Sequence, residues 1–297
     1  MAESLTRRDL DLPDTGIILV GMGPGRCEMM TQEAINAARL ADHRRYEAYT
    51  ALWPQDELDK LEKQVGSITK VMRPEIEDAT ELLELAKSSL VAVMIVGDPL
   101  QATTHVDLQL QANEMGVTCK VMHGISITTI LSGAIGLSNY KFGRSTTLTY
   151  PYGGWIATSP LEVIASNQYQ GLHTLVLLDL DPSGQGIGNQ KPMNPEDAYN
   201  SMELMWLKME DMAEDFMEPN DEFEGMKQKA ILELLENGLG GLRVVLASDM
   251  GCTNEKIIST KFAQLSEFEG GRLNCLVVPA NLGEVEEVAL RRFECGA

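Results

Sequence analysis

The sequence predicts an α/β protein of two domains, with a parallel sheet in the N-terminal domain and a mixed sheet in the C-terminal domain. Three observations support this. The first half of the 297 residues alternates short apolar runs with segments of helical periodicity. Those runs are continuously apolar, which is typical of parallel strands covered on both faces. Several strand-like runs lie close together near the C-terminal end, which favours antiparallel pairing there.

The N-terminal domain is expected over residues 16–130, after a polar tail at 1–15 that has no apolar signal-peptide core. Thr31 is suited to cap one helix, Pro74 to open another, and Gly116 to end a third. Strands are predicted at 16–21, 43–50, 67–72, 90–96 and 117–123, and helices at 31–41, 55–66, 74–89 and 105–116.

The C-terminal domain is expected over residues 131–297, with the join in the small-residue, Gly-rich stretch 124–143. A Gly/Pro-rich loop is predicted at 182–195. Strands are predicted at 144–151, 172–181, 241–248, 255–265 and 273–279, and helices at 195–214, 222–237 and 283–293.

Composition excludes several classes of function. The net charge of −20 argues against a nucleic-acid-binding face, and no apolar run is long enough for a membrane span. Five scattered cysteines without a C-x-x-C pair favour a reduced, cytoplasmic setting. Residues 209–225 hold eight acids and no base, which predicts a solvated surface, with a steering field for a basic partner as the alternative.

Motifs for several chemistries are missing from the sequence. The four histidines are far apart and form no H-E-x-x-H motif, so we expect no metal site. There is no G-x-S-x-G elbow and no P-loop lysine. No residue suggests itself as a catalytic acid or base.

Two loops that follow strands are candidate binding sites. "VGMGPG" (20–25) resembles a nucleotide-binding turn, but its glycine spacing is wrong and Pro24 lacks an amide, so a plain tight turn is equally possible. In "GDPLQATTH" (97–105), Asp98 is placed to hold a ribose hydroxyl or a ligand ammonium group, or to cap the helix that begins near Thr104. If Asp98 binds a ligand, Asp98→Ala is expected to weaken binding with little loss of stability.

The helix predicted at 195–214 carries a stripe of methionines at steps of three and four residues. Such a stripe packs in a core or forms a subunit interface. The two alternatives stay open here. The stripe consists of Met202, Met205, Met209 and Met212.

Three segments together resemble a known enzyme family: "GDPLQATTH" (97–105), the run from Tyr140 to Asp181 that contains "YKFG", "TYPYGGW" and "LLDLD", and "LVVPANLGEVEEVAL" (276–290). With "VGMGPG" they are similar to the tetrapyrrole-methylase superfamily, and within it to the methyltransferases of diphthamide biosynthesis. The resemblance covers roughly residues 16 to 293.

The resemblance implies a fold, a cofactor and a reaction. S-adenosylmethionine would bind in a cleft between two α/β domains and leave as S-adenosylhomocysteine. The acceptor would be the amino group of an amino-carboxypropyl histidine on translation elongation factor 2, and the enzyme a homodimer from an archaeon or a eukaryote. The acidity and short length of the chain favour an archaeal source. The implied cofactor contacts are Pro24, Asp98, Gln101, Ser126, Ile127, Leu178, Met250 and Asn274.

This chain departs from the family pattern at several of those positions. Leu is common where Pro24 stands and His where Asn274 stands, and one extra residue near 248–250 leaves Asp249 as an alternative to Met250. Segment 182–226 is longer than in compact members. Two other functions remain open, a corrin-ring methyltransferase of the same fold and a module that binds S-adenosylmethionine without turnover.

Overall fold

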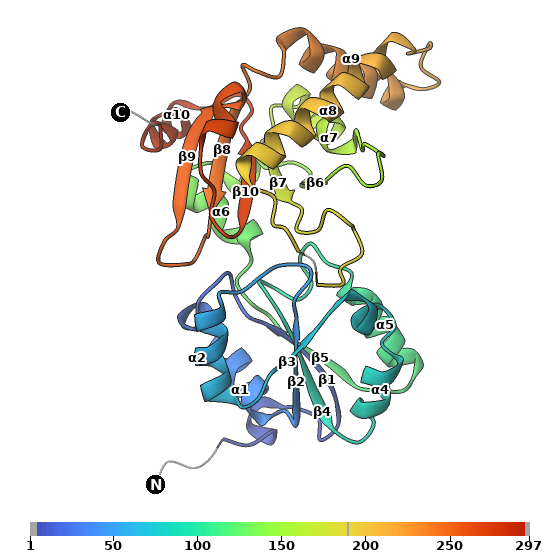
Figure 1. Cartoon of the computed structure of the whole chain (residues 1–297), viewed down its shortest axis with the longest axis vertical. Coiled ribbons are helices and arrows are strands. Elements are labelled where there is room, and N and C mark those ends of the chain that lie inside the picture. Colours follow the sequence, from blue (N-terminus) through green and yellow to red (C-terminus); the bar gives the residue numbers. More distant parts are fainter. Residues whose placement is uncertain (1–4, 189, 295–297) are drawn as a thin grey trace. The chain divides into compact units, whose positions relative to one another are not determined.

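The computed structural model describes residues 5–188 and 190–294, and these fall into two compact units (Figure 1). The first unit contains the chain up to residue 130 together with residues 185–190 and 251–253. The second unit contains the remainder. None of the described helices is both long and apolar enough to cross a lipid bilayer.

In the described part of the first unit, five strands form one sheet in the order β3-β2-β4-β1-β5, and every pair is parallel. All residues of β1 and β4 are buried, which explains their continuously apolar sequences. The parallel N-terminal sheet is therefore confirmed. The strands are β1 (Gly16–Gly21), β2 (His43–Glu47), β3 (Thr69–Val71), β4 (Leu90–Ile95) and β5 (Cys119–Met122).

Helices cover both faces of this sheet (Figure 1). Alternate β1 side chains face opposite cores: Ile18 lies with α1 and α2, whereas Ile17 lies with α4 and α5. The predicted helix at 74–89 is two helices, because Asp78 leaves helical geometry and its carboxylate accepts a 2.7 Å bond from the Thr80 hydroxyl. The helices are η1 (Arg8–Leu10), η2 (Cys27–Met29), α1 (Gln32–Leu40), α2 (Gln55–Val65), α3 (Arg73–Glu77), α4 (Thr80–Ala86) and α5 (His105–Glu114).

The described residues of the second unit form a mixed sheet in the order β6-β7-β10-β8-β9, as predicted. β6 runs parallel to β7, and the other pairs are antiparallel. The predicted strand at 255–265 is too long, because the chain turns into a 3-10 helix at Phe262 and buries that ring. The strands are β6 (Thr146–Leu148), β7 (Thr174–Leu178), β8 (Arg243–Ser248), β9 (Lys256–Lys261) and β10 (Asn274–Val278).

The helices from residue 127 onward include two that the sequence analysis did not anticipate. α6 lies in the expected inter-domain join and passes from the first unit into the second, and α7 lies within the family motif. α8 and α9 have the predicted bounds. They begin where predicted because Asn194 and Asp221 cap their first turns. The helices are α6 (Ile127–Ile135), η3 (Asn139–Lys141), α7 (Ser159–Tyr169), α8 (Pro195–Glu214), α9 (Glu222–Asn237), η4 (Phe262–Glu267) and α10 (Glu284–Arg291).

The methionine stripe of α8 packs in the core of the second unit. Met202, Met205 and Met209 are at most 2% exposed, and only Met212, at 37%, reaches the surface. The core alternative is therefore correct for three of the four methionines. The helix supplies no argument for a dimer, and dimerisation stays a prediction from the family resemblance.

Candidate functional site

The loops that follow β1, β4 and β5 meet through glycines at the carboxyl edge of the first sheet. Gly23 and Gly97 exchange backbone hydrogen bonds of 3.1 and 2.9 Å. A Cβ on Gly21 would lie 2.5 Å from the Gly124 nitrogen, and one on Gly124 would lie 2.2 Å from the Gly97 oxygen. Glycine is therefore required at these positions by backbone packing, whatever ligand the loops hold.

The same edge is a topological switch point. The loop after β1 leads to α1 on one face of the sheet, and the loop after the neighbouring β4 leads to α5 on the other face. Open α/β sheets bind their ligands in the crevice that such diverging loops leave. "VGMGPG" and "GDPLQATTH" are thus placed where a ligand site is expected.

Asp98 ties the loop after β4 to the loop after β5. Its Oδ1 accepts a 2.9 Å bond from Leu100 N, and its Oδ2 accepts bonds from Gly124 N (3.1 Å) and His123 Nδ1 (2.8 Å). Burial disfavours the charged form, but the bonds from Leu100, His123 and Gly124 outweigh it and hold the pKa of Asp98 below its usual range. These partners show that Asp98 does not cap α5, so that alternative is wrong.

The segment after Asp98 is exposed and strained. Gln101 is exposed and its backbone N–H donates to Asp98 O at 3.2 Å. Ala102 has a φ of 55°, a left-handed conformation that alanine rarely adopts. Strain of this kind costs about 1–3 kcal/mol and tends to occur at ligand sites.

The other candidate contacts of the first unit lie on the neighbouring loops. Ser126 is 6% exposed and precedes Ile127, the first residue of α6, where its Oγ accepts a bond from Thr128 N at 3.3 Å. Pro24 is buried against Gly251, on which an added Cβ would lie 2.5 Å from Pro24 Cγ. Arg26 Nε holds the same turn by donating to Gly251 O at 2.6 Å.

The candidate contacts of the second unit lie at one edge of its sheet. Asn274 opens β10 opposite Ser248, the last residue of β8, and Leu178 ends the adjacent strand β7. Met250 follows two residues after Ser248 and is 7% exposed. The register therefore brings Leu178, Asn274 and the 248–250 turn to the same end of the sheet.

The polar side chains at this edge are already bonded within the protein. Asn274 Oδ1 accepts from Ser248 Oγ (2.7 Å) and Gly271 N (2.8 Å), and its Nδ2 donates to two backbone oxygens at 3.1 Å. The Asp249 carboxylate accepts from Leu273 N (3.0 Å), Arg272 N (3.2 Å) and Asn254 Nδ2 (2.8 Å). A ligand here would meet mainly backbone groups and the apolar side chain of Met250.

Two family motifs of the second unit are joined through Asp179. Its Oδ2 accepts from Tyr150 N at 3.2 Å and from the Tyr152 hydroxyl, and its Oδ1 accepts from Leu180 N at 2.7 Å. The "YPY" and "LDLD" segments are therefore one bonded structure. The sequence analysis quoted both segments without assigning this role to either.

The buried side chain of Glu286 joins the "YKFG" segment to the "GEVEEV" segment by hydrogen bonds. Its Oε1 accepts from Ser138 N (3.0 Å) and His173 Nε2 (3.2 Å), and its Oε2 from Lys141 Nζ (2.6 Å) and Gly283 N (2.8 Å). Burial opposes ionisation, but these four donors lower the pKa of Glu286 to about 2. These motif residues stabilise the second unit.

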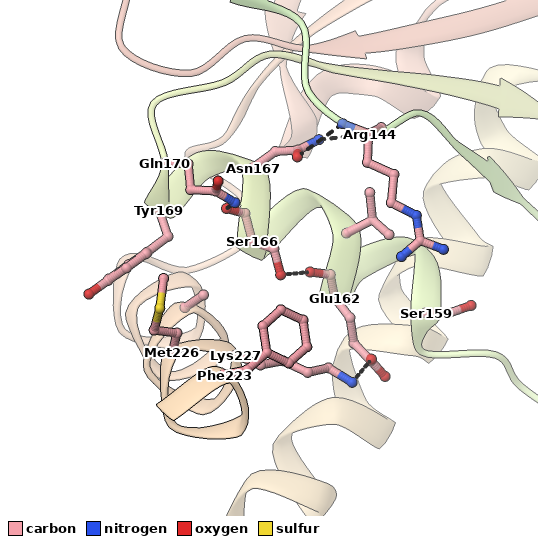
Figure 2. A pocket seen from close by; sticks show the side chains of 12 residues that line it. Arg144, Ser159, Glu162, Ser166, Asn167, Tyr169, Gln170, Phe223, Met226 and Lys227 are labelled. Carbon is pink, nitrogen blue, oxygen red and sulfur yellow. Dashed lines mark hydrogen bonds and ion pairs between the residues drawn. The ribbon is translucent and has the colours of Figure 1, made fainter. Parts of the chain in front are cut away.

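A pocket of about 340 Å³ lies between α7 and α9, away from all the predicted contact residues (Figure 2). The ion pair between Glu162 Oε2 and Lys227 Nζ, at 2.6 Å, lines one side. The exposed side chains of Phe223 and Met226 line another. None of the residues that line it belongs to the loops or strand ends predicted to hold the cofactor.

Comparison with known proteins assigns the family. The family model for tetrapyrrole (corrin/porphyrin) methylases matches residues 16–204. The chain belongs to this family. It is therefore a methyltransferase, and the sequence-based assignment is confirmed.

Full-length relatives of this tetrapyrrole methylase agree with that assignment. A diphthine synthase of Methanospirillum hungatei is 28% identical over 93% of this chain and 97% of its own length. A diphthine synthase of Saccharolobus solfataricus is 30% identical over 92% of this chain and 96% of its own length. A crystal structure of diphthine synthase superposes with a TM-score of 0.74 at 26% identity, covering 94% of this chain and 95% of that one.

The sequence analysis passed over one group of residues in this methyltransferase, at the ends of β2 and β3. Glu47, Tyr49 and Arg73 lie there, and each has a buried polar atom without a hydrogen-bond partner among the described residues. The signal in the sequence was a glutamate inside the predicted strand 43–50, which the structure ends at Glu47.

Proposed function

We propose that this methyltransferase is a diphthine synthase. It would use S-adenosylmethionine to methylate the amino group of an amino-carboxypropyl histidine on translation elongation factor 2. The observation that carries the proposal is similarity to diphthine synthases along nearly the whole chain. The match to the Methanospirillum hungatei protein covers 93% of this chain and 97% of that protein. The motifs of both units contribute to that similarity.

The proposed cofactor contacts suit an adenosyl sulfonium. Pro24, Ile127, Leu178 and Met250 offer apolar surface for the adenine and ribose carbons, and the glycine-packed loops offer backbone N–H and C=O groups. The proposed contacts are Pro24, Asp98, Gln101, Ser126, Ile127, Leu178, Met250 and Asn274. A cleft between the two domains as their common location also remains a proposal.

Asp98 is proposed to act mainly by holding its loop in place. Three of its acceptor positions are filled by the protein, so it keeps the loops after β4 and β5 together while the remaining lone pair faces a ligand hydroxyl. The bound cofactor supplies an activated methyl group, so the protein has to orient the acceptor and exclude water.

The acidic surface suits a basic protein partner. With a net charge of −20, the chain attracts a positively charged face of elongation factor 2 at low ionic strength. A homodimer is proposed from the family resemblance. A cytoplasmic protein that binds neither nucleic acid nor membrane is proposed from the scattered cysteines, the net charge and the lack of a long apolar run in the sequence.

The decisive experiment is mass spectrometry of the target histidine after incubation of unmethylated elongation factor 2 with the protein and S-adenosylmethionine. Added methyl mass on that histidine supports the proposal. Methylation of a precorrin and not of the factor would favour the corrin-ring alternative. Tight cofactor binding with no transfer to either acceptor would favour a non-catalytic module.

A further inference from the structure

Glu47 is a fully buried carboxylate with one free oxygen. It ends β2 and is 0% exposed. Its Oε1 accepts bonds from Tyr49 N (3.0 Å) and Thr50 N (2.7 Å), whereas its Oε2 has no partner within the described residues. One oxygen therefore holds the loop after β2, and the other is available to a ligand.

Two further unpaired atoms lie beside it. The Tyr49 hydroxyl and Arg73 Nε are buried and make no hydrogen bond within residues 5–188 and 190–294. The Arg73 guanidinium lies 5.2 Å from the centre of the Tyr49 ring, and Arg73 N donates to Gly186 O at 3.1 Å. An acceptor, a hydroxyl and a cationic donor are thus gathered at the ends of β2 and β3.

Unpaired buried polar atoms are rare and costly. Each one costs about 1–3 kcal/mol when it has left water without a new partner. Three of them lie on neighbouring elements, at the ends of β2 and β3. They are explained if a polar ligand completes them.

The position of the cluster supports a ligand site. β2 pairs with β4, with Tyr46 opposite Met94, so the loop that carries Glu47 and the loop that carries Asp98 leave the same edge of the sheet. This is the edge at which the cofactor is proposed to bind. The cluster therefore lies on the side where an acceptor has to approach.

We propose that this cluster is the acceptor site, with Glu47 as the general base for the acceptor amine and Arg73 as the group that binds a carboxylate on the same carbon. The inference rests on the proposed function and adds to it the residues that recognise the acceptor. The ligand class is an α-amino-α-carboxylate group, whose ammonium matches Glu47 Oε2 and whose carboxylate matches Arg73. Tyr49 donates its hydroxyl to the same group.

Methyl transfer first requires the acceptor ammonium to lose a proton. The ammonium gives one proton to Glu47 Oε2, which leaves a neutral amine and a carboxylic acid. The amine lone pair then forms a bond to the methyl carbon, the carbon–sulfur bond breaks, and sulfur keeps the electron pair as S-adenosylhomocysteine. Glu47 returns its proton to water before the next transfer.

The surroundings of Glu47 strengthen its affinity for a proton. Burial raises the pKa of Glu47, and the hydrogen bonds from Thr50 and Tyr49 and the Arg73 charge oppose that rise. The charged and titratable groups that face it are Arg73 on α3 and Tyr49 on its own loop, and Glu77 on α3 faces both of these.

The ligand reaches the cluster past the turn at residues 185–187. Gly186 lies against the Arg73 side chain, since an added Cβ there would be 2.7 Å from both Arg73 Cβ and Nε. The Arg73 side chain itself is 41% exposed. Arg73 is therefore the part of the cluster that a ligand meets first from solvent, whereas Glu47 lies behind it at 0% exposure.

The test compares Glu47→Gln with the wild type in single-turnover methyl transfer to elongation factor 2 over a pH series. Glutamine keeps an oxygen for Tyr49 N and Thr50 N but cannot accept the proton. We expect the rate at neutral pH to fall about 100-fold to 1,000-fold, with unchanged S-adenosylmethionine affinity. The gap should narrow above about pH 9, where a free α-amino group has already lost its proton.

Glu84→Gln is the matched control, because it removes an exposed carboxylate on α4 that pairs with Lys87 and is no part of the cluster. It should leave the rate and the pH profile unchanged. An equal rate for Glu47→Gln at neutral pH would overturn the inference, and so would a loss that is independent of pH.

A binding measurement separates this inference from the proposed function. L-2-aminobutyrate is titrated by calorimetry into protein saturated with S-adenosylhomocysteine, so that the cofactor site is filled. Binding by wild type and Glu84→Gln, and its loss in Glu47→Gln and Arg73→Gln, supports the cluster even if elongation factor 2 is not methylated. No binding by wild type, or equal binding by all four proteins, refutes it.

Discussion

Substitution of Glu286 by glutamine should destabilise the second unit strongly, although it replaces a single oxygen by an NH2 group and Glu286 is not a proposed ligand contact. Glutamine loses the negative charge that four donors surround, and its amide presents N–H groups to Lys141 or to a backbone N–H. Lys141 is 32% exposed and can return to water, which limits the penalty on its side.

The magnitude follows from the pKa. A carboxyl group whose pKa falls from its ordinary 4.5 to about 2 on folding contributes about 3 kcal/mol at neutral pH. Because the folded pKa is the lower one, this stability is present above pH 4.5 and is lost as the pH falls towards 2. The difference between wild type and Glu286→Gln should therefore be largest near pH 7 and shrink as the solution is acidified.

Urea unfolding of both proteins from pH 7 to pH 3 measures the difference, and Glu287→Gln is the control. Glu287 follows in the same helix but pairs with Arg243 at 33% exposure, so its loss should cost about 1 kcal/mol or less. Equal losses for the two variants at pH 7 would refute the reasoning, as would a Glu286→Gln deficit that does not depend on pH.

Four further expectations concern the first unit, the metal requirement and the assembly. Asp98→Ala should weaken S-adenosylmethionine binding in calorimetry and also lower stability by about 1–3 kcal/mol, since it leaves donors of two loops unpaired. This loss is larger than the sequence analysis expected, and urea unfolding measures it. Gly124→Ala should lower the thermal midpoint, because its Cβ meets the Gly97 oxygen at 2.2 Å and overpacking costs about 1–3 kcal/mol; an unchanged midpoint would contradict the packing. Chelation should leave methyl transfer intact, and loss restored by one divalent ion would show that a metal is needed. Light scattering should give twice the chain mass of 32.6 kDa, and a mass of 32.6 kDa would exclude the dimer.

The sequence by itself determined the class of fold and pointed to the edge of the first sheet at which a ligand is proposed to bind. Continuous apolar runs and helical periodicity are local consequences of burial, so strands such as β1 and β4 and helices such as α8 and α9 are visible in them. Glycines directly after three apolar runs marked the strand ends that meet at that edge. The motifs of both halves were enough to assign the family.

Only the tertiary structure decided what individual side chains do. His123 and Gly124, which donate to Asp98, lie 25 and 26 residues from it in the sequence, and Ser138 lies 148 residues from Glu286. The unpaired oxygen of Glu47 exists only because the loop after β2 folds back onto this side chain. Local sequence patterns also failed to predict α6, the break at Asp78 and the turn at Phe262. At these places hydrogen bonding or burial of a side chain outweighed the local secondary-structure propensity. Hydrogen bonds and charge pairs depend on distances through space, and a sequence pattern records burial but does not record which distant groups meet.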